Sequence, residues 1–416
     1  MKIIHVVLNY YPSKGGTQWL FQNISERLVK NYNDEVTVLT VNSYYGPEKK
    51  NYKKIAAATE IHNGVKIERF SFQRKHLPFL RILVKLSNRL FKTHPECWQE
   101  KLYGPISSSL HNKLQNVEAD VVCGSSSAYN YMYYSLERNG INKKPFVFMG
   151  AIHFTENKNE KVIRAKTLKA ITASEFYIAN TLFEKERLID LGIHENNIVV
   201  VGCGVEPNDF INNNRVSTRK QLNVEDDEIL IGFVGRQEPL KSIDILMNAV
   251  ADARKINNKI KLIIAGADSW YTPQLKQMIQ HTNENGNAVQ LVSNISETEK
   301  INLYHAIDVF ASASASESFG IVFVEAWACK KPVVASNVGS IRCVVDDEQN
   351  GLLSIPFNTK SFAENILLLA NNTQLRNTLG NNGYNKMLAN YTWDVITEKY
   401  RNTYLQAIKK FKSKVA

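Results

Sequence analysis

Two glutamates stand out in a segment that is otherwise strongly apolar, SESFGIVFVEAW, which runs from Ser316 to Trp327. Glu317 and Glu325 lie eight positions apart. A carboxylate is a natural acceptor for paired hydroxyl donors such as those of a sugar or a ribose. The same spacing also arises by chance, with one glutamate capping a helix and the other solvated, so the pair alone does not define a site.

The residues that bound this segment favour a short buried helix over a strand. Gly320 precedes the apolar run and Pro332 closes it, so we expect a helix over about residues 320–330. Free backbone amides near Phe319, Gly320 and Ile321 would lie at the positive end of the helix dipole, which is an anion-binding arrangement. The two glutamates would stand just before this helix and inside it, and both could face one cleft.

Two cations follow another apolar run, Ile229–Val234. In the sequence GRQEPLK they are Arg236 and Lys241. Either residue by itself is most simply a surface cation. Together with the two glutamates they suggest a site for a nucleoside diphosphate-sugar, because a diphosphate binds well to cations and helix amides.

Apolar runs of strand length alternate with helical segments along the chain, which predicts parallel sheets covered by helices. A polar stretch over residues 203–228 divides the series and is the expected linker. We therefore expect an α/β protein with two doubly wound, Rossmann-like domains that face each other across a cleft. The expected strands are Ile3–Leu8, Val36–Val41, Val65–Phe70, Val121–Cys123, Phe146–Met149 and Ile198–Val201, then Ile229–Val234, Ile260–Ala265, Val289–Val292, Val309–Ala311 and Pro332–Ala335.

Several motifs occur in a fixed order: GFVGRQEPLKSIDIL, LIIAGADS, AIDVFASASASESFGIVFVEAWACKKPVVASNVGS and EQNGLL. The first half adds YYPSKGGTQ and ASEFYIANTLFEKERLIDLGIHENNIVVVGCGVE, and a YTW motif follows near the end. With these motifs the chain resembles the retaining glycosyltransferases of family 4, which have the GT-B fold, over nearly its whole length. The family's signature of two glutamates separated by seven residues is matched by Glu317 and Glu325.

The resemblance implies a role for each matched residue. Arg236 and Lys241 would bind the donor diphosphate, and Glu325 would bind the ribose hydroxyls. Glu317 would bind the transferred sugar, assisted by the amides at the start of the helix. It also implies an acceptor-binding domain over residues 1–205, a donor-binding domain over 206–390, and a helical segment over 391–416 that packs back toward the first domain.

In the first half, Gly15 and Gly16 would allow the backbone to approach the donor closely, although an ordinary strand-to-helix turn also uses such residues. His153 matches a position where the family often places a histidine that faces the donor sugar. The chain departs from the family pattern at Ser242, where glycine is common, and at Arg342 and Cys343, where proline and glutamate are common. These departures leave the identity of the sugar open.

The resemblance implies transfer with retention of anomeric configuration and no protein nucleophile, because the leaving diphosphate assists removal of the acceptor's proton. No Asp-x-Asp metal motif is evident, so we expect no metal and no cofactor. A UDP-sugar is favoured over a GDP-sugar as the donor. Alternatives are a nucleotide-sugar epimerase of the same architecture and an inactive partner subunit; an NAD-dependent dehydrogenase is disfavoured because a Gly-rich fingerprint is absent.

The chain of 416 residues has a formal net charge of +11, and almost all of the excess lies before residue 206. The segment from Arg74 to Lys92 contains six Lys or Arg residues and no acidic residue. We interpret it as a helix that contacts an anionic membrane surface through Arg81, Lys85 and Arg89 and brings the enzyme to a lipid-linked acceptor; a core-packed helix with a solvated basic side is the alternative. Its apolar residues at helical spacing are Leu80, Leu83, Val84, Leu90 and Phe91, with Ser87 among them.

Other features exclude whole classes of protein. An apolar fraction of 44% rules out general disorder. The five scattered cysteines have no spacing typical of a zinc site or a disulfide framework. No apolar stretch reaches the length of a membrane span or a signal peptide. We therefore expect a cytoplasmic protein. From the basic segment and the resemblance we further expect it to be peripheral on the inner face of the membrane, without a nucleic-acid partner, and to act in bacterial surface polysaccharide biosynthesis such as that of lipopolysaccharide or capsule.

Overall fold

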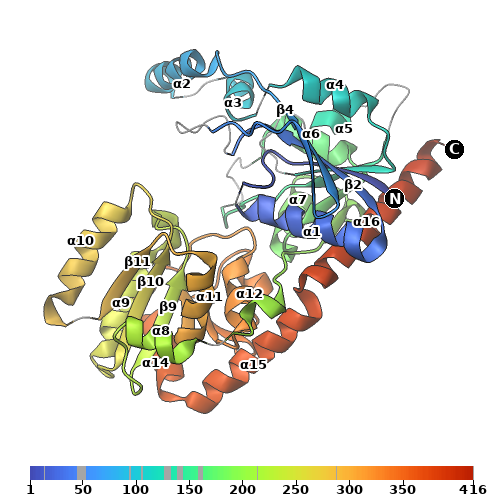
Figure 1. Ribbon diagram of the computed structural model, residues 1–416. Coiled ribbons are helices and arrows are strands. Elements are labelled where there is room, and N and C mark those ends of the chain that lie inside the picture. The colour runs from blue at the N-terminus through green and yellow to red at the C-terminus, as the bar shows by residue number, and fades with distance from the viewer. Residues whose placement is uncertain are drawn as a thin grey trace.

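The computed structural model describes residues 1–13, 15–44, 53–92, 95–104, 106–125, 133–137, 144–157, 163–212, 214–286 and 288–415. Within these residues the chain forms two sheets, one in each half, and helices cover each sheet (Figure 1). The two doubly wound domains predicted from the sequence are confirmed.

The first sheet has the strand order β3-β4-β2-β1-β5-β6-β7-β8, and every pair is parallel except β3 with β4. Its helices α4 to α7 pack in a core cluster on one face, while α1 packs in a second cluster on the other face. The strands are β1 (Lys2–Val6), β2 (Glu35–Val41), β3 (Thr59–His62), β4 (Val65–Phe70), β5 (Val121–Ser125), β6 (Phe146–Met149), β7 (Phe176–Ala179) and β8 (Ile198–Val200). The helices are α1 (Gly16–Tyr32), α2 (Leu77–Phe91), α3 (Glu96–Tyr103), α4 (Ser108–Asn116), α5 (Tyr134–Glu137), α6 (Ala165–Ala173) and α7 (Leu182–Asp190), followed by the short 3-10 helix η2 (Glu195–Asn197).

The second sheet is entirely parallel, with the order β11-β10-β9-β12-β13-β14. Helices α9, α10 and α14 pack in the core on one face, and α11, α12 and α13 pack on the other. The strands are β9 (Ile229–Val234), β10 (Ile260–Gly266), β11 (Val289–Ser293), β12 (Val309–Ser312), β13 (Val333–Ser336) and β14 (Gly351–Ser354). The helices are α8 (Arg215–Gln221), α9 (Ile243–Arg254), α10 (Thr272–Thr282), α11 (Glu297–Ala306), α12 (Ile321–Ala328), α13 (Ile341–Val344), α14 (Thr359–Asn371) and α15 (Thr373–Asn390), with the 3-10 helices η4 (Pro239–Lys241) and η5 (Asn283–Asn285).

In both sheets the strand order reverses at one point. The first strand of each series, β1 or β9, lies between its second strand and the strand that begins the other half, β5 or β12. Doubly wound sheets bind ligands beyond the carboxyl ends of the strands at this reversal. The topology therefore places the loops after β9 and β12 at the expected binding edge of the second sheet.

The last helix, α16 (Trp393–Val415), returns to the first sheet (Figure 1). Trp393, Tyr400 and Tyr404 are buried in the same core cluster as α1 and β1. The Tyr404 hydroxyl lies 3.0 Å from Nε2 of His5, and the Ser25 hydroxyl lies 2.7 Å from the other ring nitrogen. Burial lowers the pKa of His5 to about 3, so this ring is neutral and belongs to the core.

One local prediction is wrong. The polar stretch over residues 203–228 is not a simple linker, because it contains the 3-10 helix η3 (Pro207–Phe210) and the helix α8. Ser242 stands at the amino terminus of α9 in the left-handed region, at φ 47, and its side chain makes no capping hydrogen bond. Glycine adopts this conformation without steric cost, which is a physical reason for the glycine common at this position in the family that the chain resembles.

The candidate donor site

Lys241 and Glu317 meet at the reversal point of the second sheet. Lys241 ends the turn after β9, and Glu317 lies in the loop after β12. Lys241 Nζ lies 2.5 Å from Glu317 Oε1, and the two side chains are only 15% and 13% exposed. The structure thus brings together two of the residues predicted to bind the donor, and in the absence of a ligand they neutralise each other.

Arg236 lies in the same turn but is much more exposed. Its side chain is 68% exposed, and Nη1 lies 3.1 Å from Glu238 Oε1. The next residue, Gln237, is buried and donates to the Gly266 carbonyl at 3.3 Å and to the Ser293 hydroxyl at 3.1 Å. Gln237 therefore anchors the turn to the ends of β10 and β11, while Arg236 keeps the freedom to reach a ligand.

The short helix predicted near the two glutamates is present as α12, and it begins after Gly320. Gly320 is left-handed at φ 88, and a Cβ added there would lie 2.5 Å from the Phe323 ring, so only glycine fits. Among the described residues, none accepts a hydrogen bond from the amides of Phe319, Gly320 or Ile321. These amides are the free donors that an anion needs at a helix amino terminus.

Glu325 is buried inside α12, and α11 supplies both of its partners. Lys300 Nζ lies 2.7 Å from Oε1, and the Tyr304 hydroxyl donates to Oε2 at 2.8 Å. Burial acts to lower the pKa of Lys300, but Glu325 and Glu297 together raise that pKa above its ordinary value, so the ammonium stays charged. A carboxylate has about four acceptor positions. Glu325 therefore keeps capacity for further donors such as hydroxyl groups.

Lys300 and Tyr304 were missed in the sequence. They lie four residues apart on α11, which places them on one face of that helix. This spacing was the one sequence signal for the pair. It identifies Lys300 and Tyr304 as partners of Glu325 only when α12 is known to face α11.

His153 comes from the first domain, in the loop that follows β6. Desolvation lowers the pKa of His153, and the charges of Lys241 and Arg236 lower it further, while Glu317 opposes them. The ring is therefore neutral at pH 7. Because these charges act on the ring, His153 belongs to the same cluster as Arg236, Lys241 and Glu317, although it lies in the other domain.

The backbone of the His153 loop is held in place by the buried Glu184. Its carboxyl group accepts hydrogen bonds from the Ile152 amide at 2.9 Å and from the Tyr177 hydroxyl at 2.5 Å. Ala151 is left-handed at φ 49, a strained conformation for a residue with a side chain. A Cβ added to Gly150 would lie 1.8 Å from the Tyr177 hydroxyl, so the approach of that hydroxyl requires glycine.

The same loop contacts the second domain. The Ser316 hydroxyl donates to the Phe154 carbonyl at 3.4 Å, directly beside Glu317. Glu156 accepts from the Gly339 amide at 2.6 Å and from Arg342 at 2.9 Å. Arg342, one of the departures from the family pattern, thus lies at the junction of the two domains.

The remaining predicted residues lie apart from this cluster or at its edge. Gly15 and Gly16 stand at the amino terminus of α1, and a Cβ added to Gly16 would meet no atom within 4 Å. That space is open to a ligand, and the role of both glycines stays a prediction. Arg81, Lys85 and Arg89 lie on α2, at the outer end of the first domain (Figure 1).

Two searches of the described residues gave negative results. No group of three or more His, Cys, Asp or Glu side chains is arranged to hold a metal ion in the described part of the chain. None of the described helices is both long enough and apolar enough to cross a membrane.

Comparison with known proteins finds a family match within the second half of the chain. Residues 214–386 match the family model described as glycosyl transferases group 1. The match includes Arg236 and Glu317 in loops, Lys241 in η4 and Glu325 in α12. Together with His153, which lies outside the match, these residues are called the donor cluster below.

The relatives are glycosyltransferases by name. The D-inositol 3-phosphate glycosyltransferase of Stackebrandtia nassauensis is 28% identical over 250 residues, which cover 58% of this chain and 56% of that protein. The alignments with curated relatives of this name span between 43% and 61% of their length. An uncharacterised glycosyltransferase of Methanocaldococcus jannaschii is 26% identical and aligns over 95% of both chains.

Solved structures show the fold of the whole chain to be GT-B, as predicted. The HepE protein of Anabaena, crystallised with UDP, superposes with a TM-score of 0.70 at 19% identity and covers 97% of this chain and 99% of its own. The trehalose 6-phosphate synthase of Burkholderia multivorans gives a TM-score of 0.76 at 13% identity, with coverage of 100% and 98%. At these identities the likeness concerns the fold alone.

Proposed function

We propose that this protein is a retaining glycosyltransferase that moves a sugar from a nucleoside diphosphate-sugar to a hydroxyl group of a glycan or a lipid-linked acceptor. The observation that supports this most directly is the convergence of Arg236, Lys241 and Glu317 from the second domain with His153 from the first. Such a cluster provides cations for a diphosphate and carboxylate and imidazole groups for sugar hydroxyls.

The chemistry follows from the charge that develops on the leaving group. As the bond between sugar and diphosphate breaks, negative charge grows on the diphosphate. Lys241, Arg236 and the free amides at the start of α12 would stabilise that charge, and Lys241 would exchange part of its contact with Glu317 for the phosphate. Glu317 would then be free to accept a hydrogen bond from the transferred sugar, while Glu325 accepts from the ribose.

A UDP-sugar is our preferred donor, and the reaction is proposed to need no metal. Structures of the Anabaena HepE protein contain UDP or UDP-glucose, which favours this nucleotide for a protein of the same fold. The experiment is a thermal-shift screen with UDP, GDP and their glucose conjugates, because a ligand that binds only the native state raises its stability. UDP stabilisation followed by UDP release that depends on an added acceptor would support transfer.

Two other functions predict different results in the same assays. A nucleotide-sugar epimerase would isomerise the sugar of the donor without any acceptor. An inactive partner subunit would bind the donor and release no UDP under any condition. Either result would replace the proposal.

We further propose that α2 docks the enzyme on an anionic membrane surface, where a lipid-linked precursor of a bacterial surface polysaccharide would be the acceptor. Leu77 and Leu80 are the buried residues of this helix, and they pack against α3. Four large apolar side chains at helical spacing face the solvent instead. They are Phe79 (66% exposed), Ile82 (56%), Leu86 (51%) and Leu90 (71%).

The charges around this exposed apolar face fit such a surface. Lys85 and Arg89 are exposed on the same helix, and no acidic residue occurs between Glu68 and Glu96. Apolar side chains inserted at the headgroup level and flanking cations near anionic lipid both favour binding, at roughly 1 kcal/mol for each cation.

Co-sedimentation with vesicles that contain anionic lipid tests this part of the proposal. Changing Arg81, Lys85 and Arg89 to glutamate should abolish binding. A control protein with the same charge change at the exposed Lys255, Lys360 and Lys412 should bind as the wild type does. Wild-type protein that ignores the vesicles at low salt, or equal loss in both variants, would refute membrane docking through α2.

A further inference from the structure

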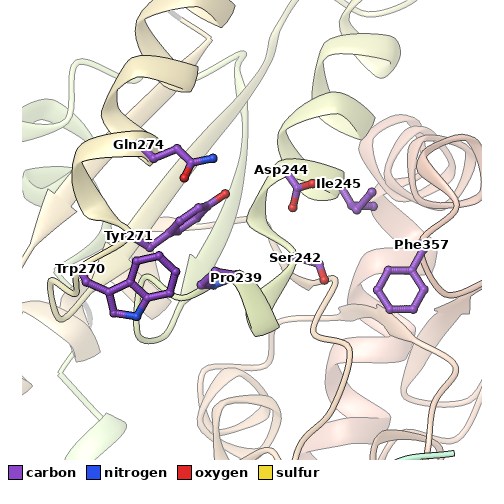
Figure 2. Close-up of a pocket in the computed structure, with 8 residues that line it drawn as sticks. All are labelled: Pro239, Ser242, Asp244, Ile245, Trp270, Tyr271, Gln274 and Phe357. Carbon is purple, nitrogen blue, oxygen red and sulfur yellow. The ribbon is translucent and has the colours of Figure 1, made fainter. Parts of the chain in front are cut away.

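A pocket of about 450 Å³ lies on the second domain, outside the donor cluster (Figure 2). Its walls come from the η4 turn and the start of α9, from the start of α10, and from the loop after β14. The volume is in the range of small-molecule sites, roughly 300–1,000 Å³. Its lining residues are Pro239, Ser242, Asp244, Ile245, Trp270, Tyr271, Gln274 and Phe357.

The pocket is separate from the site for the diphosphate. Lys241 lies in the sequence between two lining residues, yet its ammonium group pairs with Glu317 and does not line the pocket. Within the described part of the chain no Lys, Arg or His side chain lines the pocket, and Asp244 contributes a carboxylate. This charge disfavours phosphates and other anions, so the ligand is neutral or cationic.

Two large aromatic rings are presented to solvent at this pocket. Trp270 is 78% exposed and Phe357 is 63% exposed, and Figure 2 shows them on opposite sides with Pro239 and Ser242 between them. Phe357 is held in the left-handed region, at φ 57. A bulky residue in this conformation is strained, and such strain persists mainly where the surrounding structure or a function requires it.

Polar groups lie between the two rings. Among the described residues, the Asp244 carboxylate and the Gln274 amide have no hydrogen-bond partner. Tyr271 also lines the pocket. Burial raises the pKa of the Tyr271 phenol, and the charge of Asp244 raises it further. Flat apolar rings together with carboxylate, amide and hydroxyl groups suit a ligand that has apolar faces and many hydroxyl donors.

We propose that this pocket is a second binding site of the protein, which takes a neutral carbohydrate chain. The ring faces of the sugar would stack on Trp270 and Phe357, and Asp244 and Gln274 would bind its hydroxyls. This goes beyond the transfer reaction, because the site would hold the glycan whether or not a donor is bound. A polymeric acceptor or product held there would stay near the donor cluster, since Pro239 and Ser242 flank Lys241.

The test is calorimetric titration, without nucleotide, with neutral oligosaccharides of about six residues: cellohexaose, maltohexaose, mannohexaose and chitohexaose. We expect at least one to bind with a Kd on the order of 0.1–10 mM. Trp270→Ala should weaken that binding at least about tenfold, as loss of an aromatic anchor does. Trp19→Ala removes another exposed tryptophan, 52% exposed on α1, and should have no effect.

Phe357→Gly tests whether weaker oligosaccharide binding could result from loss of folding. Glycine relieves the left-handed strain, so the melting temperature should stay the same or rise while oligosaccharide binding weakens. Asp244→Asn separates the two ligand classes, because a neutral glycan should still bind, whereas an ammonium ligand would be lost. Choline is the cationic probe.

Three outcomes would overturn the inference. No saturable binding of any of the four oligosaccharides at about 10 mM excludes a carbohydrate site of useful affinity. Oligosaccharide binding that survives Trp270→Ala places the glycan elsewhere. Choline binding that is lost in Asp244→Asn, without any glycan binding, shows a cation site. None of these results depends on transfer activity, so failure here is distinct from failure of the proposed function.

Discussion

Glu184, which holds the backbone next to His153, should make the stability of the protein depend on pH. Its carboxyl group is buried, and burial raises the pKa of Glu184 to about 7, although hydrogen bonds from Tyr177, Ile152 and Asn180 act to lower it. The ordinary value is 4.5. Between pH 4.5 and 7 the folded protein therefore holds a proton that the unfolded chain has released. Stability must fall as pH rises through this window, because the folded state binds more protons than the unfolded state.

The size of the effect follows from the shift. A change of about 2.5 units at 1.36 kcal/mol per unit gives roughly 3.4 kcal/mol in total, of which about 2.5 kcal/mol is lost between pH 5 and pH 8. Glu184→Gln is neutral at every pH and removes this loss. The variant has one acceptor fewer for the Ile152 and Asn180 amides, which costs about 1–3 kcal/mol at all pH values.

The assay is urea unfolding of wild type and Glu184→Gln at pH 5 and pH 8. The free energy of unfolding of the variant relative to wild type should rise by about 2.5 kcal/mol between the two pH values. Other titrating groups such as His5 are present in both proteins and cancel in the difference. Equal pH dependence in the two proteins would refute the assignment of a protonated, buried Glu184.

Three further predictions concern the donor cluster and its support. Lys241→Ala should weaken UDP binding in calorimetry by about 10–100-fold, since it removes a charge-assisted contact of roughly 1.5–3 kcal/mol. Arg236→Ala should weaken UDP binding by less than about fivefold, because Arg236 is exposed. Normal UDP affinity in both variants would refute the diphosphate site. Glu325→Gln should weaken UDP binding, while Glu317→Gln should spare UDP and slow sugar transfer; the reverse pattern would exchange the two roles. Gly150→Ala should lower the melting temperature of the protein, because the added methyl group would displace the Tyr177 hydroxyl, and an unchanged value would contradict that contact.

Most parallel strands could be predicted because they are apolar runs bounded by polar or turn residues. All eleven expected runs contain or overlap a strand of the structure. The strands β3, β7 and β14 were not predicted; each has four residues, as do β6, β12 and β13, which were predicted. A run of four residues such as FYIA in β7 cannot be told from part of a buried helix by its periodicity. Its place in the sheet is fixed by pairing with β6 and β8, which a linear pattern does not show.

The helix α2 also shows that a linear pattern does not reveal which side of an element faces the protein. The sequence indicates an amphipathic basic helix, and that is what forms, but the apolar residues do not share one face. Leu80 is buried, whereas Leu90 and Phe91 are each 71% exposed. The helix has a narrow inner contact and a separate outer apolar stripe, because it packs mainly through its first turns against α3. Which stripe faces the protein depends on where the helix is anchored, and that is a tertiary property.

The donor cluster was predictable in its residue types but not in its pairing. Lys241 and Glu317 are 76 residues apart in sequence, and Lys300 and Glu325 are 25 apart. The first pair forms because parallel strands place successive loops at one edge of the sheet, where the order of strands reverses between β9 and β12. The second pair forms because α11 and α12 pack on the same face of that sheet. Each glutamate therefore has a cationic partner within the protein, and the two pairs differ in how a ligand can use them.

Glu325 keeps Lys300 and Tyr304 as fixed partners, whereas Glu317 would share Lys241 with an anion that enters the site. Under the proposed function, a diphosphate that drew Lys241 away would leave Glu317 uncompensated beside the neutral His153, and the hydroxyl groups of the donor sugar would then be the donors best placed to satisfy it.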